Sequence, residues 1–223
     1  MGFSYSPKVV TDGLVLYLDA ANPLSYANGS TKWKDLSRGR NNGTLVNGVN
    51  HTNGQFSFDG TNQYIEFGQV PSLQFTGDFS ATCWFKKDTS QSFKGLFGNA
   101  NYRAGGFHVA LFSNNFYFTI NNDTTEQGTG FSSQHVLADN QWYYGVGTFS
   151  NGTMTTYVNG EVTNSRSSVT MTESINPFRV GTSPQGGWNF LDGSIAMAAV
   201  YNRALSASEV LQNYNALKGR FGL

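Results

Sequence analysis

The fold is decided by two stretches, GLVLYLDAANP at residues 13–23 and DGSIAMAAVYNRALSASEV at residues 192–210. In the first, leucines stand at every second position from Leu14 to Leu18, and a period of two is typical of a β-strand. Its other positions are also apolar until Asp19, so we expect this strand inside a sheet. The second stretch reads as a strand, a turn and the start of a helix. Both stretches have the apolar pattern of core strands. They therefore predict one closed β-sandwich in which the first and last strands hold the two ends of the chain together.

Between these stretches, short apolar runs alternate with turns rich in Gly, Asn and Ser. This spacing predicts an all-β, antiparallel two-sheet jelly-roll sandwich. Further strands are expected at residues 56–58, 64–67, 79–85, 93–97, 107–112, 116–120, 141–149, 154–158 and 178–180. We predict an N-terminal arm at residues 1–12 and one domain at residues 13–223.

One helix is predicted at about residues 206–218. Ser206 and Glu209 have the spacing of a capping box, in which each side chain satisfies an exposed amide of the other. Gly219 is expected to form the C-cap. A helix this short is not stable alone and must pack on the sandwich.

Composition excludes several classes of protein. The 223 residues carry 14 basic and 14 acidic side chains, so the basic excess typical of nucleic-acid binding is missing. A net charge of zero gives little repulsion between copies, which favours a homo-oligomer or a particle-bound subunit. No stretch has the apolar core of a signal peptide or the ~20 apolar residues of a membrane span, so we expect no membrane insertion. The single cysteine, Cys83, is interpreted as a buried free thiol.

Several pieces, in this order, resemble the laminin-G-like (concanavalin A-like) jelly-roll domains of the third subtype. They are LYLD at 16–19, WKDLS at 33–37, NNGT at 41–44, FDGTNQYI at 58–65, FSATCWF at 79–85, WY at 142–143, YVNG at 157–160 and the stretch at 192–209. The amino-acid sequences of residues 15–23 and 213–221 are similar to those of such domains in tailed-phage virion proteins. That resemblance implies a capsid decoration or tail-fibre component, exposed on the particle, with other virion proteins as partners.

The resemblance also implies a structural calcium near the rim of the sandwich. The candidate ligands are Asp19, Asp59 and Asp192, because calcium prefers carboxylate and carbonyl oxygens. If the chain ends meet, Asp19 and Asp192 come close together. The alternative is that Asp59 and Asp192 only begin turns before a glycine.

Catalytic patterns are missing. Related glycoside hydrolases carry a Glu-x-Asp-x-x-Glu run, which this chain lacks, and no predicted strand places two acids on one face. Acids dispersed over several strands, such as Glu66 and Glu161, remain the alternative. The three histidines show no metal-binding spacing, and we interpret His108 as an ordinary, hydrogen-bonded residue of its strand. These observations predict a protein that is not an enzyme.

Sugar binding needs an exposed aromatic ring beside amide, acidic or guanidinium groups in loops. Three loops meet this requirement, and their candidate residues are Tyr102, Arg103, Asn121, Asn122, Asp123, Trp188 and Asn189. Trp33, Trp84 and Trp142 are expected in the core, and Trp188 could equally fold back onto it. The resulting hypothesis is a phage virion structural protein whose lectin-like jelly roll binds host-surface glycans. The alternatives are a free-standing carbohydrate-binding module and a glycoside hydrolase.

Overall fold

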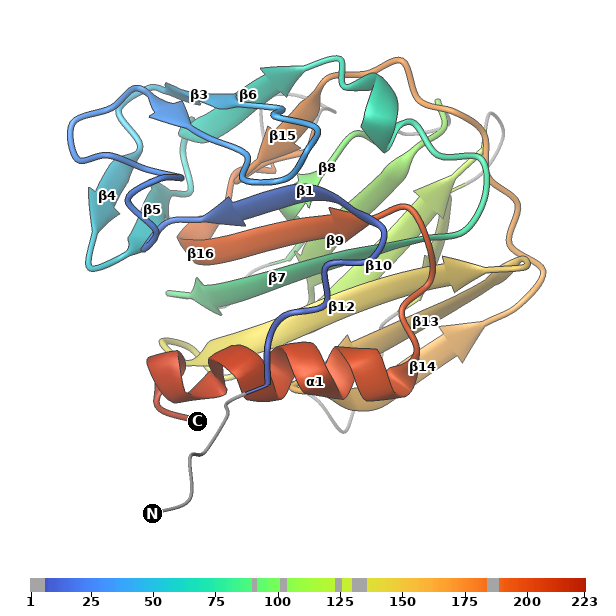
Figure 1. Cartoon of the computed structure of the whole chain (residues 1–223). Helices are drawn as coiled ribbons and strands as arrows, with labels where there is room; N and C mark the ends of the chain where they lie inside the picture. Colours follow the sequence, from blue (N-terminus) through green and yellow to red (C-terminus); the bar gives the residue numbers. More distant parts are fainter. Residues whose placement is uncertain (1–6, 90–91, 101–103, 123–125, 130–135, 184–188) are drawn as a thin grey trace.

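The computed structural model describes residues 7–89, 92–100, 104–122, 126–129, 136–183 and 189–223, with 126–129 described by backbone alone. Two antiparallel sheets face each other, and one helix lies along the outer side of one sheet (Figure 1). The predicted sandwich with a short C-terminal helix is therefore confirmed. Among the described residues, no helix is both long enough and apolar enough to cross a membrane.

Within the described residues, sheets A and B have eight strands each. In spatial order, sheet A contains β14 (Glu161–Arg166), β13 (Thr153–Val158), β12 (Trp142–Ser150), β7 (Phe79–Lys87), β16 (Asp192–Tyr201), β5 (Gln55–Asp59) and β4 (Asn50–Thr52), with β1 (Leu14–Asp19) also paired to β16. Sheet B contains β11 (Glu126–Thr129), β10 (Asn115–Asn121), β9 (Phe107–Phe112), β8 (Lys94–Gly98), β15 (Phe178–Val180), β6 (Tyr64–Gly68), β3 (Gly43–Val46) and β2 (Lys32–Trp33).

The first and last strands pair directly. In β1 and β16, Leu14 is the register partner of Tyr201, and Asp19 is the register partner of Met197. The expected tie between the chain ends is thus present. The expectation that the first strand lies inside a sheet was wrong, because its described strand partner is β16 alone. On its other side a loop covers the backbone, where the Leu36 N–H donates to the Tyr17 carbonyl at 2.9 Å. The strand is apolar on both faces because Leu16 and Leu18 pack into the core between the sheets, while Leu14 and Tyr17 pack against the apolar cluster beneath the C-terminal segment.

Apolar side chains fill the space on both sides of sheet A. Phenylalanines dominate the core between the sheets, where Phe79 stacks on Phe75 with ring centroids 4.8 Å apart. A second aromatic cluster joins sheet A to the C-terminal segment, and there Phe221 stacks on Trp84 at 4.1 Å. Trp33 and Trp84 are fully buried, as predicted, and Cys83 is a buried free thiol. The C-terminal segment therefore covers the outer face of sheet A.

The helix α1 spans Ala207–Leu217, and the predicted capping box is present. The Glu209 N–H donates to Ser206 Oγ at 3.3 Å, and the Ser206 N–H donates to Glu209 Oε2 at 2.9 Å. The Arg203 guanidinium binds the same carboxylate and lowers the pKa of Glu209 to about 2. The chain then continues as a 3-10 turn, η2 (Lys218–Phe221). The left-handed capping residue is therefore Gly222, with φ of 75°, and not Gly219 as expected. This extra turn is what carries Phe221 onto the sheet.

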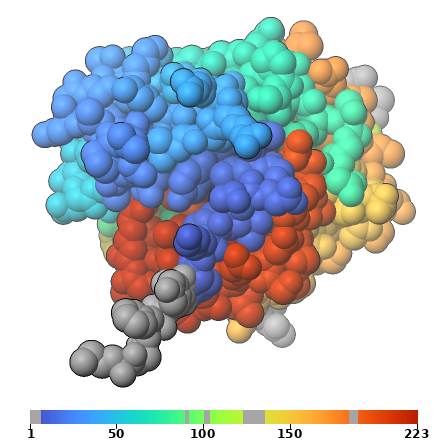
Figure 2. Space-filling view, in the orientation of Figure 1, coloured from blue at the N-terminus to red at the C-terminus, as the bar shows by residue number. Residues whose placement is uncertain are grey.

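An N-terminal arm is held against α1 by a buried hydrogen-bond network. The Val10 N–H donates to Asn213 Oδ1 at 2.8 Å, and the Tyr201 hydroxyl donates to the Val10 carbonyl at 3.0 Å. Asn213 Nδ2 in turn donates to the Tyr201 hydroxyl at 3.2 Å. Figure 2 shows the blue N-terminal segment lying against the red C-terminal residues on this face. The described part of the arm is therefore an integrated part of the domain.

Candidate functional site: the polar face of sheet B

The outer face of sheet B presents polar side chains on its central strands. In β9, Phe107, Val109 and Leu111 belong to the core between the sheets. Since side chains alternate along a strand, the intervening His108 points to the opposite, outer face. The same alternation in β10 puts Thr119 and Asn121 on that outer face.

Three polar side chains here are buried and lack a hydrogen-bond partner among the described residues. They are His108 at Nε2, Thr119 at Oγ1 and Asn189 at both amide atoms. Their exposed fractions are 2%, 1% and 0%. Most buried polar atoms in proteins are paired; unpartnered ones also occur in the described part of sheet A, at Thr82 and Tyr144, and each group needs an explanation. We call His108, Thr119, Asn121 and Asn189 the polar face.

Backbone pairing brings these residues together from distant parts of the chain. His108 and Thr119 are register partners on β9 and β10, which places their side chains beside each other. The Asn189 carbonyl accepts a hydrogen bond from the Gly95 N–H on β8 at 2.9 Å, and Gly95 is paired with Ala110, two positions from His108. His108 and Thr119 thus lie side by side on paired strands, and the backbone of Asn189 lies beside the next strand, β8.

An aromatic ring covers this part of the sheet. The Phe93 ring lies 5.4 Å from the His108 ring and 6.1 Å from the Tyr117 ring, centroid to centroid. Both contacts are edge-on, an arrangement that aromatic pairs favour. The covering helps to explain why side chains on an outer face are buried.

Burial sets the protonation of the site. Desolvation lowers the pKa of His108 to about 3, so its imidazole is neutral near neutral pH. A neutral imidazole offers one donor and one acceptor, a threonine hydroxyl offers both, and an amide offers two donors and an acceptor. Leaving such atoms unpaired costs about 1–3 kcal/mol each. The partners that these buried atoms lack are hydroxyl or amide groups.

Part of the predicted glycan site falls on this face. Asn121 and Asn189 belong to it, whereas the Asn122 amide donates to Thr170 Oγ1 at 2.7 Å. Tyr102, Arg103, Asp123 and Trp188 lie outside the described residues, so their predicted roles stay predictions.

Sequence reasoning missed His108 and Thr119. The expectation that His108 is hydrogen-bonded through its side chain was wrong at Nε2 within the described structure. The signal was present in the alternation of residues 107–112, which puts a polar residue on the face opposite the core. What the alternation could not indicate is that other segments bury this face.

The three predicted calcium ligands do not converge. Asp59 and Asp192 are register partners on β5 and β16, but Asp19 pairs five residues further along β16, about 16 Å away at 3.3 Å per residue. The Asp19 carboxylate instead binds Arg220 at 2.7 Å, and Asp59 Oδ1 accepts the Thr61 N–H at 2.9 Å within its turn. Within the described ranges, no three His, Cys, Asp or Glu residues group as metal ligands. Of the three predicted ligands, Asp59 and Asp192 are the pair that occupies opposite positions on neighbouring strands.

The dispersed glutamates do not meet at the polar face. Glu66 on β6 forms an ion pair with Arg179 Nε at 2.8 Å and accepts the Gly68 N–H at 2.9 Å. Glu161 begins β14 of the other sheet. Strands β9 and β10 contain no acidic residue.

Residues 59–211 match the family model described as the concanavalin A-like lectin/glucanases superfamily, in its third laminin-G-like subtype. The chain belongs to this family. The lectin-like fold predicted from the sequence motifs is thereby confirmed. No curated protein is significantly similar to the chain in sequence.

Solved structures with the same fold include toxin domains and a sialidase. The ligand-binding domain of botulinum neurotoxin serotype D in complex with N-acetylneuraminic acid has a TM-score of 0.74 at 15% identity, over 92% of this chain and 51% of that one. Trypanosoma rangeli sialidase in complex with sialic acid has a TM-score of 0.70 at 17% identity, over 96% and 36%. The binding domain of Paraclostridial mosquitocidal protein 1 has a TM-score of 0.68 at 19% identity, over 92% and 52%. This chain thus spans about half of the toxin domains and about a third of the sialidase, and the likeness shows the fold.

Proposed function

We propose that the protein is a non-enzymatic carbohydrate-binding module whose glycan contacts the polar face of sheet B. The observation that carries the proposal is the group of buried, unpartnered polar atoms at His108, Thr119 and Asn189. Membership of a family that includes lectins supports it. A saccharide is the ligand class that presents alternating hydroxyl donors and acceptors to such groups.

Binding is favoured over hydrolysis by the chemistry of the face. Glycoside hydrolysis uses a pair of carboxylates beside the scissile bond. The described outward-facing side chains of β9 and β10 are imidazole, hydroxyl, amide, aromatic and methyl groups. These groups orient a sugar through hydrogen bonds and stacking but cannot supply the acid and nucleophile of a retaining glycosidase.

A glycan array tests the proposal with the wild type and two polar-face variants, Thr119→Val and His108→Leu. We expect both variants to lose the saccharides that bind at the polar face, because each removes hydrogen-bonding atoms from it. Thr155→Val, on β13 of the other sheet, is the matched control and should bind as the wild type does. N-acetylneuraminic acid is the first ligand to include, because it occupies the related neurotoxin domain. A set of bound saccharides that is unchanged in both polar-face variants would overturn the proposal.

We further propose that this module is a virion structural protein, displayed as a capsid decoration or a tail-fibre component. The support is the resemblance of residues 15–23 and 213–221 to phage virion proteins, together with a net charge of zero. Mass spectrometry of purified particles from the source tests this setting. Copies in the particle would support it, and a protein found only free in the host lysate would overturn it while leaving glycan binding to be judged by the array.

A further inference from the structure

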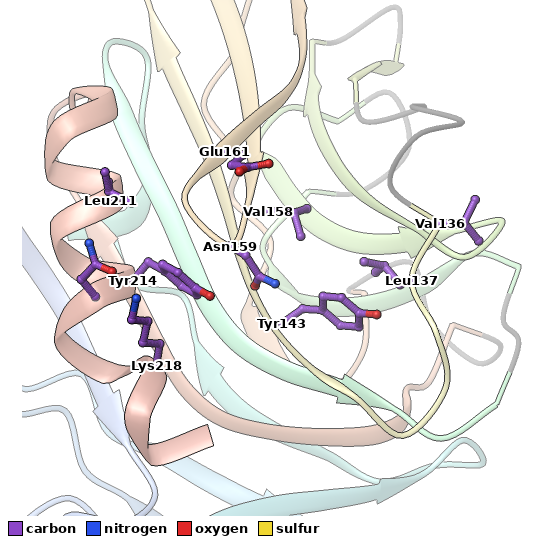
Figure 3. Close-up of a pocket in the computed structure, with 10 residues that line it drawn as sticks. Val136, Leu137, Tyr143, Val158, Asn159, Glu161, Leu211, Tyr214 and Lys218 are labelled. Atoms are coloured by element: carbon purple, nitrogen blue, oxygen red, sulfur yellow. The ribbon is translucent and has the colours of Figure 1, made fainter. Parts of the chain in front are cut away.

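A hollow of about 530 Å³ lies on the other side of the sandwich, between α1, the end of β12–β14 and the segment at Val136 and Leu137 (Figure 3). We propose that this hollow is a second saccharide-binding site, separate from the polar face. Its volume lies in the range of small-molecule pockets, about 300–1,000 Å³.

The walls are fixed by a tight contact between a turn and the helix. Asn159 and Gly160 link β13 to β14 in left-handed conformations, with φ of 53° and 88°. A Cβ at Gly160 would lie 2.9 Å from the Leu211 side chain, so the missing side chain lets α1 approach the turn. Asn159 Oδ1 accepts the Tyr144 N–H at 2.9 Å, which holds the turn against β12.

Two tyrosine rings face into the hollow from different elements (Figure 3). Tyr214 of α1 is stacked on Trp84 of sheet A, with centroids 5.8 Å apart and planes 15° apart. The Tyr143 hydroxyl accepts the Ala138 N–H at 2.9 Å. Because both rings are already held, little side-chain entropy is lost when a ligand stacks on them.

The polar groups in the hollow match hydroxyl groups. The Glu161 carboxylate only accepts hydrogen bonds, the Lys218 ammonium only donates them, and the Asn215 amide does both. In the described part of the chain, neither Glu161 nor Lys218 belongs to an ion pair, and Lys218 Nζ lies 5.4 Å from the Tyr214 ring centroid. A wholly apolar ligand would desolvate both charges without pairing them, which is costly. A saccharide pairs both.

The rim of the hollow is apolar and open. Val136 is 62% exposed and Leu211 is 46% exposed. Beside the two tyrosine rings, they form a surface for the C–H face of a pyranose. Aromatic and aliphatic surface surrounded by a few hydrogen-bonding groups is the composition expected of a sugar site.

The hollow does not depend on the polar face. It is built on α1 and sheet A, whereas the polar face belongs to sheet B. Tyr214, Asn215 and Lys218 also lie beyond residue 211, where the match to the family ends. The helix side of the hollow thus lies largely outside the matched region, whereas its other walls lie within it.

The test compares two charge-neutralised double variants on a glycan array, followed by calorimetric titration with lactose, cellobiose and sialyllactose. Glu161→Gln with Lys218→Gln alters the hollow, and Glu173→Gln with Lys34→Gln is the matched control at exposed positions elsewhere. We expect the first variant to bind about tenfold more weakly for each charge-assisted hydrogen bond lost, while the control binds as the wild type does. A third variant, Asn215→Trp, fills the hollow and should abolish binding there.

The outcomes separate the two sites. Saccharide binding that is lost in the hollow variants but retained in Thr119→Val supports the hollow. Binding that is unchanged in Asn215→Trp and in the Glu161/Lys218 double variant overturns it, whatever the polar face does. An array on which no saccharide binds the wild type overturns both proposals.

Discussion

Replacing Thr119 by valine should make the free protein more stable while it weakens glycan binding. The Thr119 side chain is 1% exposed, and its hydroxyl has no partner among the described residues. Valine has nearly the same shape, so the substitution removes an unpaired polar atom without leaving a cavity. Most buried substitutions destabilise a protein, and a gain here would identify the hydroxyl as retained for a ligand.

The magnitude follows from the cost of burying an unpaired polar group. That cost is about 1–3 kcal/mol, and Thr119→Val should recover most of it. For a chain of this length, each kcal/mol raises the melting temperature by about 2–4 °C. Differential scanning calorimetry and urea unfolding measure the gain in the unliganded protein.

The matched control is Thr156→Val on sheet A. Thr156 is also fully buried, but its hydroxyl accepts a hydrogen bond from the Thr163 hydroxyl at 2.9 Å. Valine there leaves Thr163 without this partner, so the control should lose about 1 kcal/mol. The two variants make the same chemical change and should shift stability in opposite directions.

A loss of stability in Thr119→Val as large as that in the control would refute the reasoning. It would mean that the Thr119 hydroxyl is satisfied in the free protein, for example by an ordered water molecule. The polar face would then be a structural network, and the argument for a ligand there would fail.

Other predictions concern charge, packing and metal. Below pH 6.5, the ordinary histidine pKa, the unfolding free energy of the wild type should fall by about 1.4 kcal/mol per pH unit more than that of His108→Leu. The reason is that the unfolded chain takes up a proton that native His108, with a pKa of about 3, does not. Unfolding free energies that fall in parallel with pH in the two proteins would contradict this. Asn213→Leu should lower the unfolding free energy by about 2–3 kcal/mol, because it removes the buried hydrogen bonds from the Val10 N–H and to the Tyr201 hydroxyl; an unchanged urea midpoint would count against it. Phe221→Ala should cost about 1–2 kcal/mol and red-shift tryptophan fluorescence by uncovering Trp84, whereas an unshifted spectrum would show that another group covers it. Calcium should raise the melting temperature by relieving repulsion between paired carboxylates, and Asp59→Asn should remove the shift; identical melting curves in calcium and in chelator would argue against a metal.

Strands with strong alternation could be predicted from the sequence, and weakly patterned ones could not. The expected strand at residues 79–85 appears as β7 because its apolar and β-branched residues have one stable arrangement, buried on both faces. Strand β14, with the sequence EVTNSR, went unpredicted because an exposed edge strand needs no apolar period. The short, polar β4 went unpredicted for the same reason.

The candidate site could be predicted only in part. Asn121 was predicted because it is an amide at the end of a strand, and it lies on the polar face. His108 was dismissed because the three histidines show no metal-binding spacing and a strand histidine is ordinarily hydrogen-bonded. Its ring is covered by Phe93, which reaches it from another part of the chain.

The sequence by itself determined the class of fold, the tie between the chain ends and the capped helix, because alternation and capping depend on residues within a few positions of one another. Tertiary structure alone decided which polar groups are satisfied. Asn213 is hydrogen-bonded to Val10, 203 residues away in the sequence, whereas the Thr119 hydroxyl has no hydrogen-bond partner among the described residues. The tertiary structure also separates two predicted calcium ligands, because Asp19 pairs with β16 five residues away from Asp192. Hydrogen-bond partners are set by the packing of remote segments, and no local pattern records which segments will meet.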